Sequence, residues 1–221
     1  MKWDGLPVVI LGTGDVSREL IYLIEEINLA CRQPIYQARA VVAENEAAAE
    51  KWTGQTPVIV ETELVELASR FPLLGAAIPI GSPLVKKKIY EKIKAIPNLV
   101  YPNFVHPSVN LRDLRLGMGN IIQENVTISI GAELGDFNLL NYGSFLGHDV
   151  RTGSFTVIGP LAKICGRVQV GAESLIGVGA TVLQGLTIGR RAVVGAGAAV
   201  TGNVDDGQTV LGVPARPKQQ H

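Results

Sequence analysis

From about residue 100 onward, the chain repeats an aliphatic residue at a strict interval of six. An α-helix repeats at 3.6 residues and a two-faced strand at 2, so neither explains this period. A period of six predicts a coil of short strands and tight corners, with each aliphatic side chain stacked on its counterpart one coil away. Of 15 such positions, 14 hold Leu, Ile or Val and only Thr152 does not. They are Leu116, Ile122, Ile128, Leu134, Leu140, Leu146, Ile158, Ile164, Val170, Ile176, Val182, Ile188, Val194 and Val200.

Glycine and small residues accompany the aliphatic series. The chain contains 25 glycines, and glycine directly follows the aliphatic position in nine repeats. Hydrophobic residues make up 47% of the chain and aromatic residues only 5%, which favours a core of aliphatic side chains. We therefore expect the glycines to sit at the corners of about five stacked coils, spaced about 4.8 Å apart.

The first hundred residues follow a different pattern, in which apolar runs alternate with amphipathic segments. The apolar runs predict strands at 7–12, 38–43, 57–60 and 75–81, and the amphipathic segments predict helices over 17–27, 61–71 and 83–96. This alternation predicts a small parallel sheet covered by helices. The run from Lys86 to Lys88 is interpreted as the solvent-facing side of the last helix.

Charge and cysteine content exclude several classes of protein. Lys plus Arg and Asp plus Glu both total 20, so no net charge favours nucleic acid or an anionic membrane. No apolar run is long enough to span a bilayer, and the first residues do not read as a signal peptide. Cys31 and Cys165 form neither a metal-ligand spacing nor a disulfide framework, which predicts a reduced, cytoplasmic setting and no metal.

The hexad pattern resembles the left-handed parallel β-helix of the hexapeptide-repeat acyltransferases. The whole chain is similar to one branch of them, the bacterial nucleotide-sugar N-acetyltransferases and the related sialic acid O-acetyltransferases. The matching segments are ILGTG…REL (10–20), HPS (106–108), NYGSFLGHD (141–149) and VGAGAAVTGNV…GVPAR (194–216). The resemblance implies a Rossmann-like nucleotide-sugar-binding domain over 1–104 and a left-handed β-helix acyltransferase domain over 105–221. It also implies a homotrimer with acetyl-CoA lying between neighbouring β-helices.

His148 is the candidate general base for acetyl transfer. The unperturbed pKa of an imidazole, about 6.5, suits proton transfer near neutral pH, and a neighbouring carboxylate such as that of Asp149 favours the protonated ring. Gly166 follows His148 by 18 residues, so we expect it one coil further on. There it would let a thioester approach its backbone N–H, and the resemblance implies the same role. Asn141 matches an asparagine of the family that binds substrate, or it is a corner residue in the left-handed conformation.

The glycine loop after the first strand is the candidate nucleotide-sugar site. Gly12, Thr13 and Gly14 lie between a strand and a helix, a place that suits phosphate, although a simple tight turn is the alternative. A dinucleotide fingerprint would need glycine where Ser17 stands, so NAD is not expected. Glu44 and Asn45 end the second strand and are further candidates.

Two departures from the family pattern concern acetyl-CoA. The family often has a histidine nine residues after the catalytic one, where this chain has Val157. A lysine that is common near residues 201–203 is also missing, and Arg190 and Arg191 are candidates to supply positive charge for acetyl-CoA. We therefore predict an acetyl-CoA-dependent N-acetyltransferase of a nucleotide-activated amino sugar. The alternatives are a sugar O-acetyltransferase of the sialic acid type and a trimeric binding scaffold that has lost catalysis.

Overall fold

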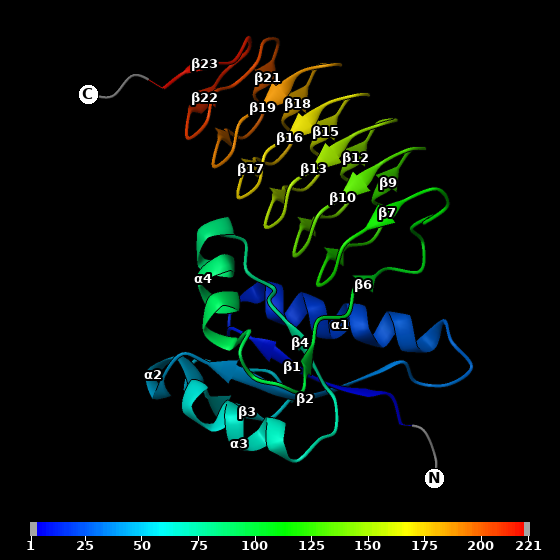
Figure 1. The fold of residues 1–221 in the computed structure, drawn as a ribbon, viewed down its shortest axis with the longest axis vertical. Coiled ribbons are helices and arrows are strands. Elements are labelled where there is room, and N and C mark those ends of the chain that lie inside the picture. The colour runs from blue at the N-terminus through cyan, green and yellow to red at the C-terminus, as the bar shows by residue number, and fades with distance from the viewer. Residues whose placement is uncertain (1–3, 219–221) are drawn as a thin grey trace.

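The computed structural model describes residues 4–218, which form an α/β unit stacked end to end against a three-sided coil of strands (Figure 1). The α/β unit contains one five-stranded sheet, here called sheet A, with the order β3-β2-β1-β4-β5. Its strands are β1 (Leu6–Leu11), β2 (Tyr36–Ala43), β3 (Val58–Val60), β4 (Leu74–Ala77) and β5 (Leu99–Val100), and every pairing is parallel.

Helices cover both faces of sheet A. They are α1 (Asp15–Leu29), α2 (Glu46–Ala49), α3 (Leu64–Ser69) and α4 (Pro83–Ile93), and a 3₁₀ turn η1 (Glu61–Glu63) precedes α3. Apolar side chains of α1 pack on the face that presents Val8 and Ile10, whereas α3 and α4 pack on the face that presents Val9 and Leu11. The predicted parallel sheet covered by helices is confirmed. The short helix α2 and the strand β5 were not predicted.

The coil consists of three sheets, here called B, C and D. Sheet B contains β6 (Phe104–Val105), β8 (Ile121–Ile122), β11 (Leu139–Leu140), β14 (Val157–Ile158), β17 (Leu175–Ile176), β20 (Val193–Val194), β22 (Thr209–Leu211) and β23 (Arg216–Pro217). Sheet C contains β7 (Arg115–Leu116), β10 (Glu133–Leu134), β13 (Arg151–Thr152), β16 (Gln169–Val170) and β19 (Thr187–Ile188). Sheet D contains β9 (Thr127–Ile128), β12 (Phe145–Leu146), β15 (Lys163–Ile164), β18 (Thr181–Val182) and β21 (Ala199–Val200).

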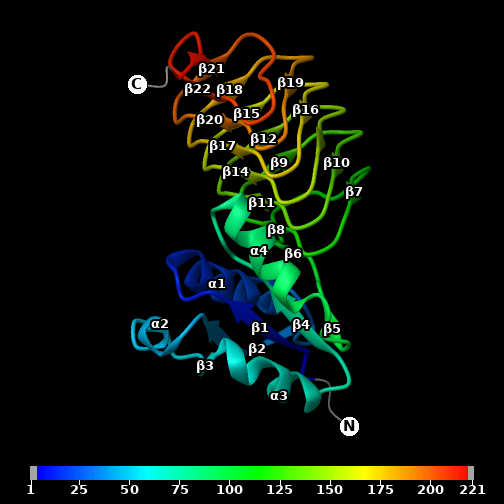
Figure 2. The ribbon, with the colours of Figure 1, turned by 60° about the vertical axis from the view of Figure 1, so that its left-hand side comes forward.

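Between β7 and β21 the strands pair with a constant offset of 18 residues. Leu134 lies opposite Thr152, and Leu146 lies opposite Ile164. Each aliphatic position of the hexad series is the second residue of a strand, and nearly all of these side chains belong to one buried core. The predicted β-helix is therefore confirmed, with the aliphatic residues pointing inward. The successive coils are visible side by side in Figure 2.

Thr152, the exception in the aliphatic series, has a polar partner inside the coil. Its side chain is buried, and its hydroxyl oxygen accepts a hydrogen bond of 3.2 Å from Nδ2 of the fully buried Asn138. The backbone nitrogen of Thr156 in turn donates to Oδ1 of Asn138. A buried amide needs such partners, so a hydroxyl replaces the aliphatic side chain at this one position.

The corners combine two different backbone requirements. A residue with positive φ recurs every six residues, and Asp149 (φ 57°) and Gly143 (φ 63°) are examples. The glycines that directly follow the aliphatic position are not these residues. At Gly147, a Cβ atom would lie 2.6 Å from the backbone nitrogen of Gly166 in the next coil. These glycines therefore allow close stacking of the coils rather than a left-handed turn.

Two helices attach the α/β unit to the coil. Leu20, Leu23, Ile24 and Ile27 of α1 share a buried cluster with residues on the outer face of sheet B, namely Phe104, Ile121, Leu139 and Val157. Tyr90 of α4 packs on Phe137 and Phe155, which lie at the same corner of consecutive coils and stack on each other with ring centroids 5.1 Å apart. No helix within residues 4–218 is long and apolar enough to span a membrane.

The interpretation of Lys86 as a solvent-facing residue is wrong. Its side chain is only 1% exposed, and its Nζ donates a hydrogen bond of 3.0 Å to the backbone carbonyl of Phe137. Burial lowers the pKa of Lys86 from 10.5 to about 7 because the charged ammonium is poorly solvated there. The helix pattern did not reveal this because α4 packs against both sheet A and the coil.

Lys86 should make the stability of the protein depend on pH. The unfolded chain keeps the lysine proton up to about pH 10.5, whereas the folded chain releases it near pH 7. The free energy of unfolding should therefore rise between these values, by up to about 1.4 kcal/mol per pH unit, and this term should not change below pH 7. Urea unfolding from pH 6.5 to 9.5 measures the free energy of unfolding of the wild type and of Lys86→Met, and the difference between the two should grow as the pH rises above 7. The exposed Lys51→Met is the matched control, and a wild-type minus Lys86→Met difference that stays flat with pH would contradict the prediction.

Candidate active site

His148 and Asp149 occupy the corner between β12 and β13. Nδ1 of His148 lies 2.8 Å from Oδ2 of Asp149, and the imidazole side chain is 41% exposed. The backbone of Asp149 has a positive φ, which turns the chain at this corner. The turn brings the carboxylate of Asp149 beside the imidazole of His148. The Asp149 side chain also lies against Gly131, one coil earlier, where a Cβ atom would lie 2.5 Å from Oδ1.

Gly166 lies directly beneath the imidazole of His148. A Cβ atom at residue 166 would lie 2.4 Å from Nε2 of His148, so only glycine fits below the ring in this position. Gly166 is buried, and its N–H donates no hydrogen bond to any described residue. The 18-residue spacing thus brings together the two residues that the sequence analysis paired, and it leaves one backbone donor free beside the ring.

This arrangement can perform proton transfer at one defined atom. The carboxylate of Asp149 accepts the hydrogen bond from Nδ1–H, which leaves the lone pair on Nε2, the atom that faces Gly166. An imidazole oriented in this way is a general base for a nucleophile that approaches Nε2. The free N–H of Gly166 beside it can donate to an oxygen that develops negative charge.

Asn141 lies on a different corner, between β11 and β12. Its backbone is not in the left-handed region, and Gly143 takes that conformation in this corner. The interpretation of Asn141 as a left-handed corner residue is therefore wrong, whereas its role in substrate binding stays a prediction. Val157 is buried against α1 on sheet B, so the residue at this position does not face the corner of His148.

Arg190 and Arg191 lie after β19, on the corner between sheets C and B rather than on that of His148. Both guanidinium groups pair with Glu173, at 3.5 and 3.0 Å, and Lys87 of α4 approaches the same carboxylate to 2.7 Å. The hydrogen bond from Lys87, assisted by that from Arg191, holds the pKa of Glu173 below its usual value. These arginines thus belong to a charge cluster that joins α4 to the coil, and their contact with acetyl-CoA stays a prediction.

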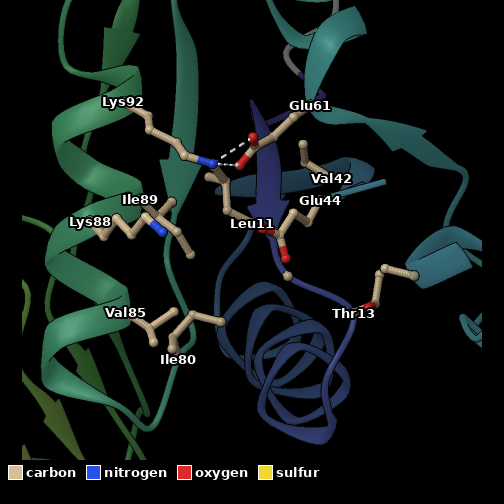
Figure 3. Close-up of a pocket in the computed structure, with 12 residues that line it drawn as sticks. Leu11, Thr13, Val42, Glu44, Glu61, Ile80, Val85, Lys88, Ile89 and Lys92 are labelled. Atoms are coloured by element: carbon tan, nitrogen blue, oxygen red, sulfur yellow. Dashed lines mark hydrogen bonds and ion pairs between the residues drawn. The ribbon is translucent and has the colours of Figure 1, made fainter. Parts of the chain in front are cut away.

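The second predicted site is a cavity of about 340 Å³ at the carboxyl edge of sheet A. Gly12, Thr13 and Glu44 line it, as Figure 3 shows for Thr13 and Glu44. Gly12 has a φ of 112°, and a Cβ atom there would lie 2.8 Å from the side chain of Ile80. The buried hydroxyl of Ser17 donates to the carbonyl of Gly12, which explains serine at this position.

The remaining predicted residues of this site have backbone roles. Gly14 caps the N-terminus of α1, where no side chain accepts a hydrogen bond from the first turn. The side chain of Asn45 accepts a hydrogen bond from the backbone nitrogen of Ala48 and caps α2, and it does not line the cavity. Because no side chain caps α1, the N–H groups that precede Ser17 in its first turn are available to an anion at the glycine loop, whereas that of Ser17 donates to the carbonyl of Gly14.

Sequence reasoning missed two lysines of the cavity. Lys88 and Lys92 reach it from α4, and Lys92 pairs with Glu61 at 2.8 Å (Figure 3). Lys88 makes no ion pair with a described residue, and the lining of the cavity also contains the carboxylates of Glu44 and Glu61. The spacing of four residues between Lys88 and Lys92, which places both on one face of a helix, was the available signal. Within residues 4–218, no three His, Cys, Asp or Glu side chains are grouped so that they could hold a metal ion.

Solved structures of acetyltransferases resemble this chain over nearly its whole length. Perosamine N-acetyltransferase from Caulobacter crescentus, as a histidine-to-asparagine mutant in complex with CoA and GDP-perosamine, has a TM-score of 0.85 and 28% identity, with 97% of each chain covered. The acetyltransferase domain of PglB from Neisseria gonorrhoeae, in complex with acetyl coenzyme A, has a TM-score of 0.82 and 25% identity over 97% of this chain and 100% of that one.

WeeI from Acinetobacter baumannii shares the fold, with a TM-score of 0.82 and 21% identity over 96% of this chain and 100% of that one. Comparison with profiles of known protein families and with curated proteins gives no match. The structural neighbours are acetyltransferases of the left-handed β-helix, hexapeptide-repeat family, so the resemblance seen in the sequence and the left-handed β-helix are confirmed.

Proposed function

We propose that this protein is an acetyl-CoA-dependent N-acetyltransferase that acts on a nucleotide-activated amino sugar. The observation that carries the proposal is the imidazole of His148, held by Asp149 with Nε2 directly above Gly166. The neighbour in complex with CoA and GDP-perosamine, crystallised with a mutated histidine, supports both the co-substrate and the class of acceptor.

The proposed reaction uses His148 as general base. The amino group of the sugar attacks the thioester carbonyl, and Nε2 of His148 takes the proton that the nitrogen loses. A C–N bond forms and the C–S bond breaks, and the proton passes from His148 to the sulfur of the departing CoA. Asp149 stabilises the imidazolium, and the N–H of Gly166 donates to the carbonyl oxygen as it gains negative charge. The fit of acetyl-CoA rests on this same gap over Gly166, which a side chain would fill.

We assign the two parts of the chain to two domains, a Rossmann-like domain over 1–104 that binds the nucleotide sugar and an acyltransferase domain over 105–221. The parallel order of sheet A and the cavity at its carboxyl edge support nucleotide binding by Gly12, Thr13 and Gly14. Glu44 lines the same cavity and Lys88 adds positive charge to it, whereas Asn45 would act through its cap of α2. Asn141 is proposed as a further substrate contact.

We also propose that the protein is a homotrimer. Large apolar side chains remain exposed on sheet D and on its two corners, and exposed apolar patches of this kind mark interfaces. They are Ile130, Tyr142, Phe145, Leu161, Val178 and Leu183, with Ile130 67% exposed. Sedimentation equilibrium should give three times the mass of the chain, and Ile130→Asp should shift the mass toward the monomer. The two unpaired cysteines support a cytoplasmic location.

CoA release from acetyl-CoA tests the proposed function directly. Acceptors should include GDP- and UDP-linked amino sugars, the same amino sugars without nucleotide, and sialic acid. We expect turnover with a nucleotide-linked amino sugar and much less with the free sugar, because the nucleotide supplies binding energy at the glycine loop. Turnover with sialic acid alone would favour O-acetylation, and no turnover together with no binding of acetyl-CoA would favour a scaffold.

Gly166→Ala should reduce acetyl transfer while the fold persists. The new Cβ would overlap Nε2 of His148, and a half-exposed imidazole can rotate away without disturbing the core. We expect kcat/KM to fall by about 10- to 100-fold, since misplacing a catalytic group by about 1 Å costs on this scale. Gly202→Ala is the matched control, because Gly202 occupies the equivalent corner two coils on and a Cβ there meets nothing within 4 Å. Equal kinetics for the two variants would contradict the role of Gly166.

A further inference from the structure

A second cavity lies where α1 meets the first coils of the β-helix, and we call it the junction cavity. It has a volume of about 240 Å³ and is lined by Tyr22, Leu23, Glu26, His106, Gln123, Glu124 and Tyr142. These residues come from α1, from the turn after β6, and from the corners after β8 and β11. The first coils and α1 lie against each other in both views of the fold (Figures 1 and 2). The junction cavity shares no lining residue with the cavity at the glycine loop.

Gln123 is the first sign that this cavity holds a ligand. Its side chain is 1% exposed, and its Nε2 has no hydrogen-bond partner among the described residues. Native proteins satisfy nearly all buried amide groups, and an unpaired one costs about 1–3 kcal/mol. A ligand oxygen that accepts a hydrogen bond from Gln123 would remove this cost.

His106 offers a second hydrogen-bond donor. Its Nδ1 accepts a hydrogen bond of 3.1 Å from the backbone N–H of Ser108, and the Ser108 hydroxyl lies 2.8 Å from the same nitrogen. Because Nδ1 is an acceptor, the proton of the neutral ring is on Nε2. That N–H makes no hydrogen bond with a described residue, so the cavity presents two unpaired donors.

The charge of the junction cavity is negative. Glu26 and Glu124 both line it, and neither carboxylate makes an ion pair or a hydrogen bond with a described residue. Burial, together with the negative charges of Glu19 and Glu124, raises the pKa of the Tyr142 hydroxyl. A positively charged group is therefore favoured here, and the rings of Tyr22 and Tyr142 can add cation–π attraction.

We propose that the junction cavity binds a small hydroxylated amine about the size of one sugar ring. Its ammonium group would pair with Glu26 and Glu124, and its hydroxyl oxygens would accept hydrogen bonds from Gln123 and His106. The volume is below the roughly 300–1,000 Å³ of pockets for drug-sized ligands, which limits the ligand to a single ring. Such a ligand would touch both α1 and the coil. This site goes beyond the proposed acetyl transfer, because His148, Asp149 and Gly166 do not line it.

Isothermal titration calorimetry with glucosamine, at pH 7 and without acetyl-CoA, tests the proposal. N-acetylglucosamine is the uncharged comparison, since it keeps the ring and its hydroxyls but lacks the ammonium group. We expect saturable binding of glucosamine to the wild type and at least tenfold weaker binding of N-acetylglucosamine. Because the readout does not need catalysis, its failure is distinguishable from failure of the proposed function.

Four variants locate the binding. Glu26→Gln, Glu124→Gln and Gln123→Met should each raise the dissociation constant for glucosamine about tenfold. Glu25→Gln is the matched control, because Glu25 is the exposed neighbour of Glu26 on α1 and lies outside the cavity, and it should bind as the wild type does. Should Gln123→Met fail to fold, Glu26→Gln and Glu124→Gln still show whether glucosamine binds in the junction cavity. Three results would overturn the proposal. The first is that the wild type shows no binding, the second is that Glu26→Gln and Glu124→Gln leave binding unchanged, and the third is that GDP bound at the glycine loop competes with glucosamine.

Discussion

His148→Ala should lower kcat for acetyl transfer by about 10²- to 10⁴-fold, the usual contribution of a positioned general base. The variant loses the imidazole that faces Gly166, so the amine must release its proton to water. Because the ring is 41% exposed and stands on a corner, its removal leaves no cavity in the core. CoA release with the best nucleotide-linked amino sugar measures the loss, and the far-ultraviolet circular dichroism should match that of the wild type.

Two further variants sharpen this test. Asp149→Asn keeps a side chain that tolerates the left-handed corner but removes the charge opposite Nδ1, so we expect a smaller loss, about 10-fold. Gln184→Ala is the matched control, since Gln184 is exposed at the equivalent corner two coils along and should behave as the wild type. Turnover by His148→Ala within threefold of the wild type would exclude this residue as the base.

Phe137→Ala should destabilise the protein by about 3–5 kcal/mol, the usual cost of truncating a fully buried phenylalanine. The ring is 1% exposed and lies against Tyr90 of α4, Tyr101 and Phe155, with centroids 4.6 to 5.1 Å away. Its loss would leave a cavity where α4 meets the coil. Urea unfolding at constant pH measures the change in the free energy of unfolding.

Phe155→Ala provides the comparison for this cluster. Phe155 stacks on Phe137 from the next coil but is only partly buried, so its truncation should cost less than that of Phe137. A loss below about 1 kcal/mol for Phe137→Ala would show that the cluster does not hold the two parts of the chain together. A larger loss in the free energy of unfolding for Phe155→Ala than for Phe137→Ala would contradict the conclusion that Phe137 is the more buried and more important ring of the cluster.

Periodic features were predictable from the sequence. Every coil repeats the same six-residue pattern, so the inward position of Leu146 also fixes that of Ile164, and Gly166 must then follow His148 by one coil. The close approach of these two residues is a consequence of this period and of the spacing between strands. Most strands and helices of the α/β unit were likewise predicted, because each has its own pattern of apolar residues, whereas the short α2 and β5 were not.

Other features depend on how α1 and α4 pack against the coil, which no period encodes. The pattern of α4 placed Lys86 in solvent, but the helix is covered on two sides and buries it. The charge of Arg190 suggested a ligand, yet its guanidinium pairs with Glu173, and Lys87 of α4 approaches the same carboxylate. Gln123 is buried and lines a cavity together with residues of α1, and no sequence pattern marks it.

The amino-acid sequence by itself determined the β-helix, its inward residues and the pairing of His148 with Gly166, because local repetition specifies each of them. Only the tertiary structure decided the partner of Thr152, the burial of Lys86, the lysines of the glycine-loop cavity and the junction cavity. These arise from contacts between residues far apart in the chain, and such contacts form only when the α/β unit and the coil pack together.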